Sequence, residues 1–184
     1  MNQGLFVYCP YCATRLERRE RFQRVRPTCP ACGFIQFLDP KVAVIGMVTW
    51  HDHVLLIRRG VEPMAGSWAL PGGYMDAGEM PESALVRELQ EEVGLTVQVQ
   101  RLLSIYPMAG RGPSSGGIVL AYHAVVDGRD SDDSTPPALC CADDACEAAW
   151  LRADQLPDDL AFESTVMLLS EWQQNGFGGD KTEA

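Results

Sequence analysis

Three glutamates, Glu88, Glu91 and Glu92, are the residues whose types and spacing most directly indicate chemistry in this chain. On a helix they stand at i, i+3 and i+4, so their side chains share one face. Carboxylate oxygens are the ligands that hard cations such as Mg²⁺ and Mn²⁺ prefer. A metal held there can polarise a phosphorus atom and activate a water molecule. The alternative is a solvated acidic face, but it does not account for the Gly72–Gly73 turn or for Arg87 beside the cluster.

A second set of candidate ligands comes from the cysteines. Four of the seven form two CxxC pairs, Cys9 with Cys12 and Cys29 with Cys32. Each pair fits a tight turn that aims two thiolates at one ion, and Gly33 supplies the positive φ that such turns need. Four thiolates around Zn²⁺ form a closed tetrahedron, which is the structural kind of zinc site. A redox CxxC is the competing interpretation, but that motif normally stands alone beside a βαβ unit. The spacing therefore predicts a structural zinc module.

Charge is unevenly distributed along the chain, whose net charge is −10. Residues 1–41 hold seven Lys or Arg against three Asp or Glu, and the acidic residues are concentrated in residues 42–184. An acidic body repels the phosphate backbone, which excludes general nucleic-acid binding by that part. The front segment could form a local patch for phosphate or RNA, and the alternative is a solvated face interleaved with Glu17 and Glu20. Its basic residues are Arg15, Arg18, Arg19, Arg21, Arg24, Arg26 and Lys41.

No apolar run is long enough to cross a membrane, so no transmembrane helix is expected. The first residues lack both a basic region and a long apolar core, and a secretory signal is therefore not expected. The predicted compartment is the cytoplasm.

The elements that must position these residues follow from hydrophobic pattern and turn residues. The β-branched run 42–50 predicts a buried strand, and a turn at 51–53 leads into a returning strand at 54–58. Pro81 fits the first turn of a helix over 82–93 that ends at Gly94. Further expected elements are strands at 96–105, 117–126 and 147–151 and an amphipathic helix at 160–174.

Residues 127–146 are rich in Asp, Ser and Pro, which predicts a long, mobile polar loop. Three cysteines in it, Cys140, Cys141 and Cys146, lack matching ligand spacing. They are interpreted as free thiols, with a second metal site as the alternative.

Residues 73–95 match the Nudix box at every fixed position, so residues 42–173 resemble a Nudix hydrolase. The resemblance implies an α/β (α+β) fold: an α/β/α sandwich with a mixed sheet. It also implies that water attacks one phosphorus of a pyrophosphate that links a nucleoside to another moiety. The expected organisation is a four-cysteine zinc ribbon at 1–38, a Nudix domain at 39–175 and a flexible tail at 176–184.

By this resemblance, Glu88, Glu91 and Glu92 hold the catalytic Mg²⁺ or Mn²⁺ ions. The Gly73 carbonyl is a possible further ligand.

The resemblance also assigns roles around the metal. Arg87 orients the glutamates, and Glu79 braces the loop or reaches a metal through water. The general base in such enzymes is either a glutamate of the box, here Glu88 or Glu91, or a glutamate from a distant loop. Glu147 is the candidate for the distant carboxylate, and the alternative is a plain surface residue.

A four-cysteine ribbon joined to a Nudix domain resembles two groups of enzymes. Bacterial NADH pyrophosphatases, which also remove NAD caps from RNA, carry a Ser-Gln-Pro-Trp-Pro-Phe-Pro stretch beyond the box, and residues 103–111 of this chain depart from it. Plant plastid FAD/ADP-ribose pyrophosphatases share the style of segments 39–41, 68–74 and 160–164. The second resemblance is closer and implies hydrolysis of FAD or ADP-ribose to AMP plus FMN or ribose 5-phosphate.

Substrate-binding candidates are arginines for the distal phosphate and an aromatic platform for the base. Arg58, Arg59 and Arg111 could pair with the phosphate, and surface salt bridges are the alternative for each. Tyr74 is a candidate platform, whereas Trp68 is expected to lie in the core.

A non-catalytic nucleotide sensor with a nucleic-acid-binding ribbon is a further alternative. The four intact box residues Arg87, Glu88, Glu91 and Glu92 argue against it. The expected partner is a nucleotide small molecule; a homodimer is compatible with the ribbon-bearing relatives, and capped RNA is the one nucleic acid left open.

Overall fold

The computed structural model describes residues 6–108, 116–127 and 135–175. The chain divides into two compact units, residues 1–41 with 107–118, and residues 42–106 with 119–184. No helix within the described ranges is long and apolar enough to span a membrane. The predicted domain boundaries at 38/39 and 175/176 stay predictions.

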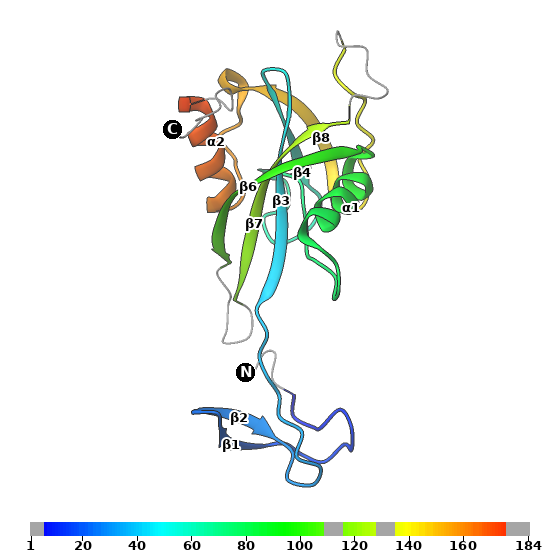
Figure 1. Cartoon of the computed structure of the whole chain (residues 1–184). Coiled ribbons are helices and arrows are strands. Elements are labelled where there is room, and N and C mark those ends of the chain that lie inside the picture. The colour runs from blue at the N-terminus through cyan, green and yellow to red at the C-terminus, as the bar shows by residue number, and fades with distance from the viewer. Residues whose placement is uncertain (1–5, 109–115, 128–134, 176–184) are drawn as a thin grey trace. The chain divides into compact units, whose positions relative to one another are not determined.

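The first unit contains an antiparallel hairpin, drawn in blue in Figure 1, of strands β1 (Glu17–Arg21) and β2 (Arg24–Thr28). Its turn residues Phe22 and Gln23 both have positive φ, at 50° and 61°. That combination is the geometry of a type I′ turn, whose twist matches two strands joined by a two-residue loop.

The second unit is built on a six-stranded sheet in the order β5-β4-β3-β7-β6, with β8 pairing β4. A parallel bridge between Trp68 and Leu160 accompanies the antiparallel pairs, so the pairing is mixed. The elements are β3 (Lys41–Trp50), β4 (His53–Arg59), β5 (Trp68–Ala69), α1 (Pro81–Val93), β6 (Val97–Met108), β7 (Gly117–Val126), β8 (Ala145–Arg152), a 3₁₀ turn at Ala153–Gln155 and α2 (Glu163–Asn175).

Strand β4 shows why the sheet is covered on both faces. Leu55 and Ile57 belong to the core that contains Leu85, Leu89 and Val93 of α1. Val54 and Leu56 belong to a second core, with Leu168, Leu169 and Trp172 of α2. Since alternate strand residues point to opposite faces, α1 and α2 cover opposite sides of the sheet (Figure 1). Each of these fully buried aliphatic side chains contributes about 1.5–3 kcal/mol. The expected α/β/α sandwich is confirmed.

The helix predicted over 82–93 is confirmed as α1, with Pro81 as its first residue. Gly94 ends it in the left-handed conformation at φ 72°, and its N–H donates to the Gln90 carbonyl at 3.1 Å. Glycine adopts this conformation without the penalty that a Cβ would add.

Several predicted boundaries are wrong, including the end of the strand predicted over 96–105, which runs to Met108. The helix predicted from Leu160 begins at Glu163, because Leu160 pairs with Trp68 and Phe162 has a φ of 64°. His53, placed in a turn by the sequence, is the first residue of β4 and pairs with Trp50. The loop predicted to reach residue 146 ends earlier, because β8 begins at Ala145.

Candidate active site and cysteine cluster

The loop before α1 is hydrogen-bonded along strand β3. Val44 N–H donates to the Gly73 carbonyl at 2.8 Å, and Met75 N–H donates to the Val42 carbonyl at 3.0 Å. These two bonds give the loop the rigidity of a sheet edge. The Gly73 carbonyl, predicted as a metal ligand, therefore already accepts one bond and keeps one lone pair.

Two glycines allow this loop to lie close to its neighbours. A Cβ on Gly72 would stand 2.1 Å from the Val44 carbonyl oxygen, and φ at Gly72 is 143°. A Cβ on Gly73 would stand 2.6 Å from the Glu88 carboxylate. Only a residue without a side chain fits at position 72, and a side chain at position 73 would require the Glu88 carboxylate to move.

Arg87 connects this loop to the glutamates of α1. Its Nε donates to Glu79 Oε1 at 2.9 Å, and its Nη2 donates to the Tyr74 carbonyl at 3.1 Å. Its Nη1 donates to Glu88 Oε1 at 2.8 Å and to Glu91 Oε2 at 3.0 Å. The planar guanidinium can serve several acceptors at once, because its donors form a fixed fork. The hydrogen bond from Arg87 also holds the pKa of the Glu79 carboxyl below its ordinary value.

Two of the three helix glutamates are buried. Glu88 is 9% exposed and Glu92 is 3% exposed, and Glu92 Oε2 accepts the Gly72 N–H at 2.9 Å. Burial raises the pKa of Glu92 to about 8, and the charge of Glu88 adds to this effect. Burial also raises the pKa of Glu88, and there the charge of Glu91 adds to the effect. A carboxyl group that is buried in this way loses its proton less readily, and a nearby cation would stabilise its ionised form. This donor set therefore fits a hard divalent ion.

Two aspartates that the sequence reasoning passed over approach this pair. The charge of Asp143 adds to the effect of burial on the pKa of Glu88, and Asp144 does the same for Glu92. Gly60 N–H donates to the Asp144 carbonyl at 2.7 Å, which ties the segment to the end of β4. Residues 143–144 form a turn, and the mobility predicted for the loop stays a prediction. The sequence feature that could have indicated these two aspartates is their position as an acidic pair directly before a predicted strand.

Glu147 and Arg58, both predicted as site residues, form an ion pair with each other. They face one another across β4 and β8, and Arg58 Nη1 lies 3.3 Å from Glu147 Oε2. The neighbouring Ala148 packs on the core that contains α1, so strand alternation directs Glu147 to the opposite face. The structure thus does not join Glu147 to the helix glutamates, and its role as a base stays a prediction. Arg111 lies outside the described residues.

Arg59 and Tyr74 lie nearer to the glutamates. The charge of Arg59 acts to lower the pKa of Glu92, and its Cζ stands 5.0 Å from the centre of the Phe162 ring. Tyr74 is 52% exposed, and its carbonyl accepts the bond from Arg87. In the described part of the chain, Arg59 is therefore a better-placed cation than Arg58.

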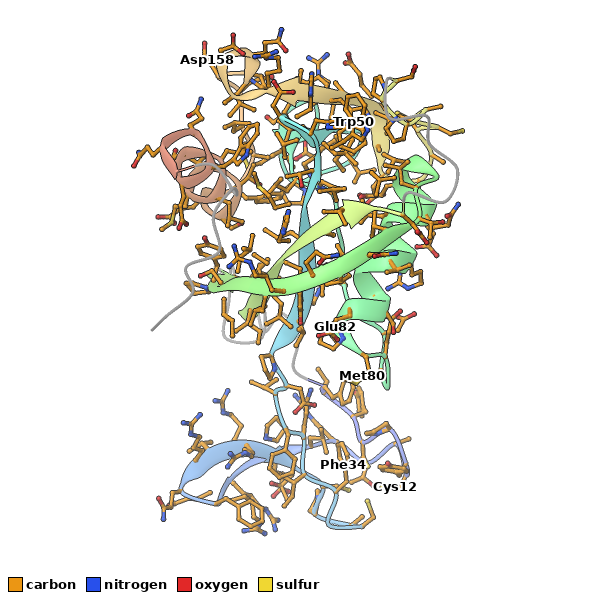
Figure 2. All side chains as sticks on the ribbon, turned by 45° about the horizontal axis from the view of Figure 1, so that its top comes forward. Cys12, Phe34, Trp50, Met80, Glu82 and Asp158 are labelled. Carbon is orange, nitrogen blue, oxygen red and sulfur yellow. The ribbon has the colours of Figure 1, made fainter. Side chains whose placement is uncertain are left out.

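The four cysteines of the first unit converge on one point. Cys9 Sγ lies 3.5 Å from Cys32 Sγ, and Cys12 Sγ lies 3.5 Å from Cys29 Sγ (Cys12 is labelled in Figure 2). Sulfurs around a tetrahedral zinc at 2.3 Å stand about 3.8 Å apart. Across the described ranges, this is the single group of three or more His, Cys, Asp or Glu whose donor atoms all lie within 4.8 Å of one another. The predicted ligand set of a zinc ribbon is brought together.

Several known proteins are similar to this chain in sequence or in structure. The family model described as the NUDIX domain matches residues 38–169. An ADP-ribose pyrophosphatase of Methanocaldococcus jannaschii is 38% identical over 69% of this chain and 70% of its own length. An NAD-capped RNA hydrolase NudC of Pseudomonas aeruginosa is 32% identical over 82% of this chain, but over only 49% of its own length. A NUDIX hydrolase from Nitrosomonas europaea has a similar structure, with a TM-score of 0.78, 23% identity and coverage of 92% of this chain and 91% of its own.

We expect purified protein to contain about one zinc ion per chain, held by the four cysteines. A strong chelator should release that ion and unfold the first unit, because a structural site contributes its binding energy to folding. Metal analysis and hydrogen exchange measure the two effects. Cys141→Ser is the matched control and should leave zinc content unchanged; a zinc-free but fully protected first unit would contradict the assignment.

The buried Glu92 predicts a pH dependence of stability in buffer without divalent ions. Its pKa is about 8 in the folded chain against 4.5 for an exposed glutamate, so the folded state binds more protons between these values. The free energy of unfolding should then fall as pH rises from about 5 to about 8. Urea unfolding at several pH values measures this fall. Glu92→Gln should show a smaller fall than the native chain, and an equal fall would contradict the assignment.

Proposed function

The chain belongs to the Nudix hydrolase family, and from this premise we propose that it hydrolyses the pyrophosphate bond of a nucleoside diphosphate derivative. ADP-ribose or FAD is the proposed substrate, giving AMP plus ribose 5-phosphate or FMN. The observation that carries the proposal is the buried pair Glu88 and Glu92, held against the Gly72–Gly73 turn.

Glu88, Glu91 and Glu92 are the proposed ligands of the catalytic Mg²⁺ or Mn²⁺, with the free lone pair of the Gly73 carbonyl as a further donor. Their oxygen-only chemistry suits these hard ions better than zinc or copper. When bound, such an ion supplies charge stabilisation at the phosphate and lowers the pKa of a bound water molecule.

Arg87 is proposed as the positioning residue of the site. It restrains Glu88 and Glu91 from the helix and Glu79 from the loop, so their geometry is set before substrate arrives. Restraint of this kind lowers the reorganisation that a charged site needs during reaction. Glu79 accepts the bond that braces the loop, and its second oxygen accepts the Asp76 N–H at 3.1 Å.

Glu91 is the proposed acceptor of the proton from the attacking water. Its side chain is 48% exposed, whereas Glu88 and Glu92 are closed off from solvent. An exposed carboxylate on the same helical face can pass the proton to bulk water after each turnover. Asp143 and Asp144 keep the surroundings acidic, and Glu147 is the more remote candidate because strand alternation directs it to the face of the sheet opposite α1.

ADP-ribose is favoured by the relative from Methanocaldococcus jannaschii, which bears that activity in its name. The exposed Tyr74 ring is proposed to support the base, and Arg58, Arg59 and Arg111 are the proposed cations for the phosphates.

NADH or an NAD cap on RNA is the second candidate substrate. The similarity to NudC covers 82% of this chain, more than the span of the NUDIX domain alone. Against it stands the departure of residues 103–111 from the stretch that NADH pyrophosphatases carry. The cytoplasm and a homodimer stay predictions.

The deciding experiment incubates the full chain with ADP-ribose, FAD, NADH and NAD-capped RNA, each with Mg²⁺ or Mn²⁺. We expect mass spectrometry to show AMP with ribose 5-phosphate or with FMN. Water enriched in the heavy oxygen isotope should label one product and so identify the attacked phosphorus. Faster cleavage of NADH or capped RNA than of ADP-ribose and FAD would select the second candidate, and no turnover of any pyrophosphate would overturn the proposal.

Glu91→Gln should lower kcat by at least about 100-fold, the usual contribution of a positioned proton acceptor. Because the Glu91 side chain is half exposed, the variant should keep the melting temperature and zinc content of the native chain. Glu171→Gln, an exposed glutamate of α2, is the matched control and should keep full activity. Unchanged kcat in Glu91→Gln would refute the role.

A further inference from the structure

One face of the β1–β2 hairpin is crowded with arginine. The pairing register sets Arg19 directly opposite Arg26 and Arg21 directly opposite Arg24, and paired residues share a face of the sheet. Glu17 is the one carboxylate that the two strands place on this face. The opposite face carries Arg18, paired with Pro27, and Glu20, paired with Val25.

Like charges directly opposite one another destabilise a hairpin. Internal contacts relieve only part of this repulsion: Arg19 pairs with Glu17, and Arg26 Nη1 donates to the carbonyls of Arg21 and Phe22. Support of a zinc site does not by itself account for two Arg–Arg pairs. An anionic partner would neutralise these arginines and so remove the repulsion that destabilises the hairpin.

Exposed aromatic rings stand beside these arginines. Phe22 is 71% exposed and Phe37 is 50% exposed, and their ring centres lie 6.0 Å apart. Arg26 Cζ lies 5.1 Å from the Phe37 ring centre and 6.0 Å from that of Phe22. Exposed rings interleaved with cations match the surfaces that stack bases while pairing the phosphates between them.

We propose that the Arg19–Arg21–Arg24 face, with Phe22 and Phe37, binds single-stranded nucleic acid. The arginines contact successive phosphates, and the two rings stack unpaired bases. A second copy's acidic domain would satisfy the charge but would not use two rings held side by side in solvent. This proposal rests on the hairpin and on Phe37 of the same unit, and it is independent of the pyrophosphatase activity.

The test measures fluorescence anisotropy of a labelled oligothymidylate of about twelve nucleotides with the zinc-loaded full chain at low salt. Arg24→Ala should weaken binding and reduce the slope of log affinity against log salt by about 0.7, the value for one phosphate contact on a single strand. Arg18→Ala removes the same charge from the opposite face and should leave the slope unchanged. Phe22→Ala should weaken binding by roughly 5- to 150-fold, and Phe22→Tyr should restore it.

Each variant is first checked for native zinc content, so that loss of the ribbon is not mistaken for loss of the surface. ADP-ribose hydrolysis should be the same in Arg24→Ala as in the native chain, which separates this test from that of the enzyme. Three results would overturn the proposal: no binding by the native chain at low salt, equal effects of Arg18→Ala and Arg24→Ala, or a native dimer that Arg24→Ala dissociates.

Discussion

The guanidinium of Arg87 holds together groups that would otherwise repel one another. Glu88 and Glu91 lie on the same helix and Glu79 on the preceding loop, and one cation donates to all three. Its Nη2 donates to the Tyr74 carbonyl and to Glu79 Oε2, which fixes the loop backbone as well as the Glu79 side chain. Without this cation, the loop would be tied to a side chain of α1 by the bond from Gly72 N–H to Glu92 Oε2, but Glu79 and the Tyr74 carbonyl would lose their link to Glu88 and Glu91. The charge of Arg87 also favours the ionised form of Glu88 and so opposes the effect of burial and of Glu91 on its pKa.

The chain contains two sets of candidate metal ligands of opposite kinds. Four cysteine sulfurs in the first unit surround one point and leave no position for a substrate, which is the arrangement of a structural zinc site. On α1, Arg87 Nη1 stands between the carboxylates of Glu88 and Glu91 and donates to both, so these two carboxylates do not close around one point. An open oxygen site of this kind suits an ion that must also meet phosphate oxygens. The chemistry of each donor set thus agrees with the role of the unit that carries it.

The sequence predicted the positions of site residues within one helix better than the positions of residues that depend on how the strands pair. The i, i+3 and i+4 pattern of Glu88, Glu91 and Glu92 and the stop at Gly94 follow from helix geometry alone, and the structure has both. Glu147 and Arg58 depend on the register of β8 against β4, and a shift of one residue moves every side chain to the other face. Asp144 is positioned by a hydrogen bond from Gly60, 84 positions earlier in the chain. No periodicity within the acidic segment could have indicated that contact.

Among the described residues, the hydrogen-bond partners of Arg87 lie between residues 74 and 91. The bonds through which Arg87 holds Glu79, Glu88 and Glu91 are therefore internal to one short stretch. Of the groups proposed to contact the substrate, the Tyr74 ring lies at the start of this stretch, whereas Arg58 and Arg59 come from β4. A substitution of Arg58 or Arg59 would thus leave the hydrogen bonds of Arg87 in place, so the groups proposed to select the nucleotide and the groups proposed to hold the metal can be varied separately.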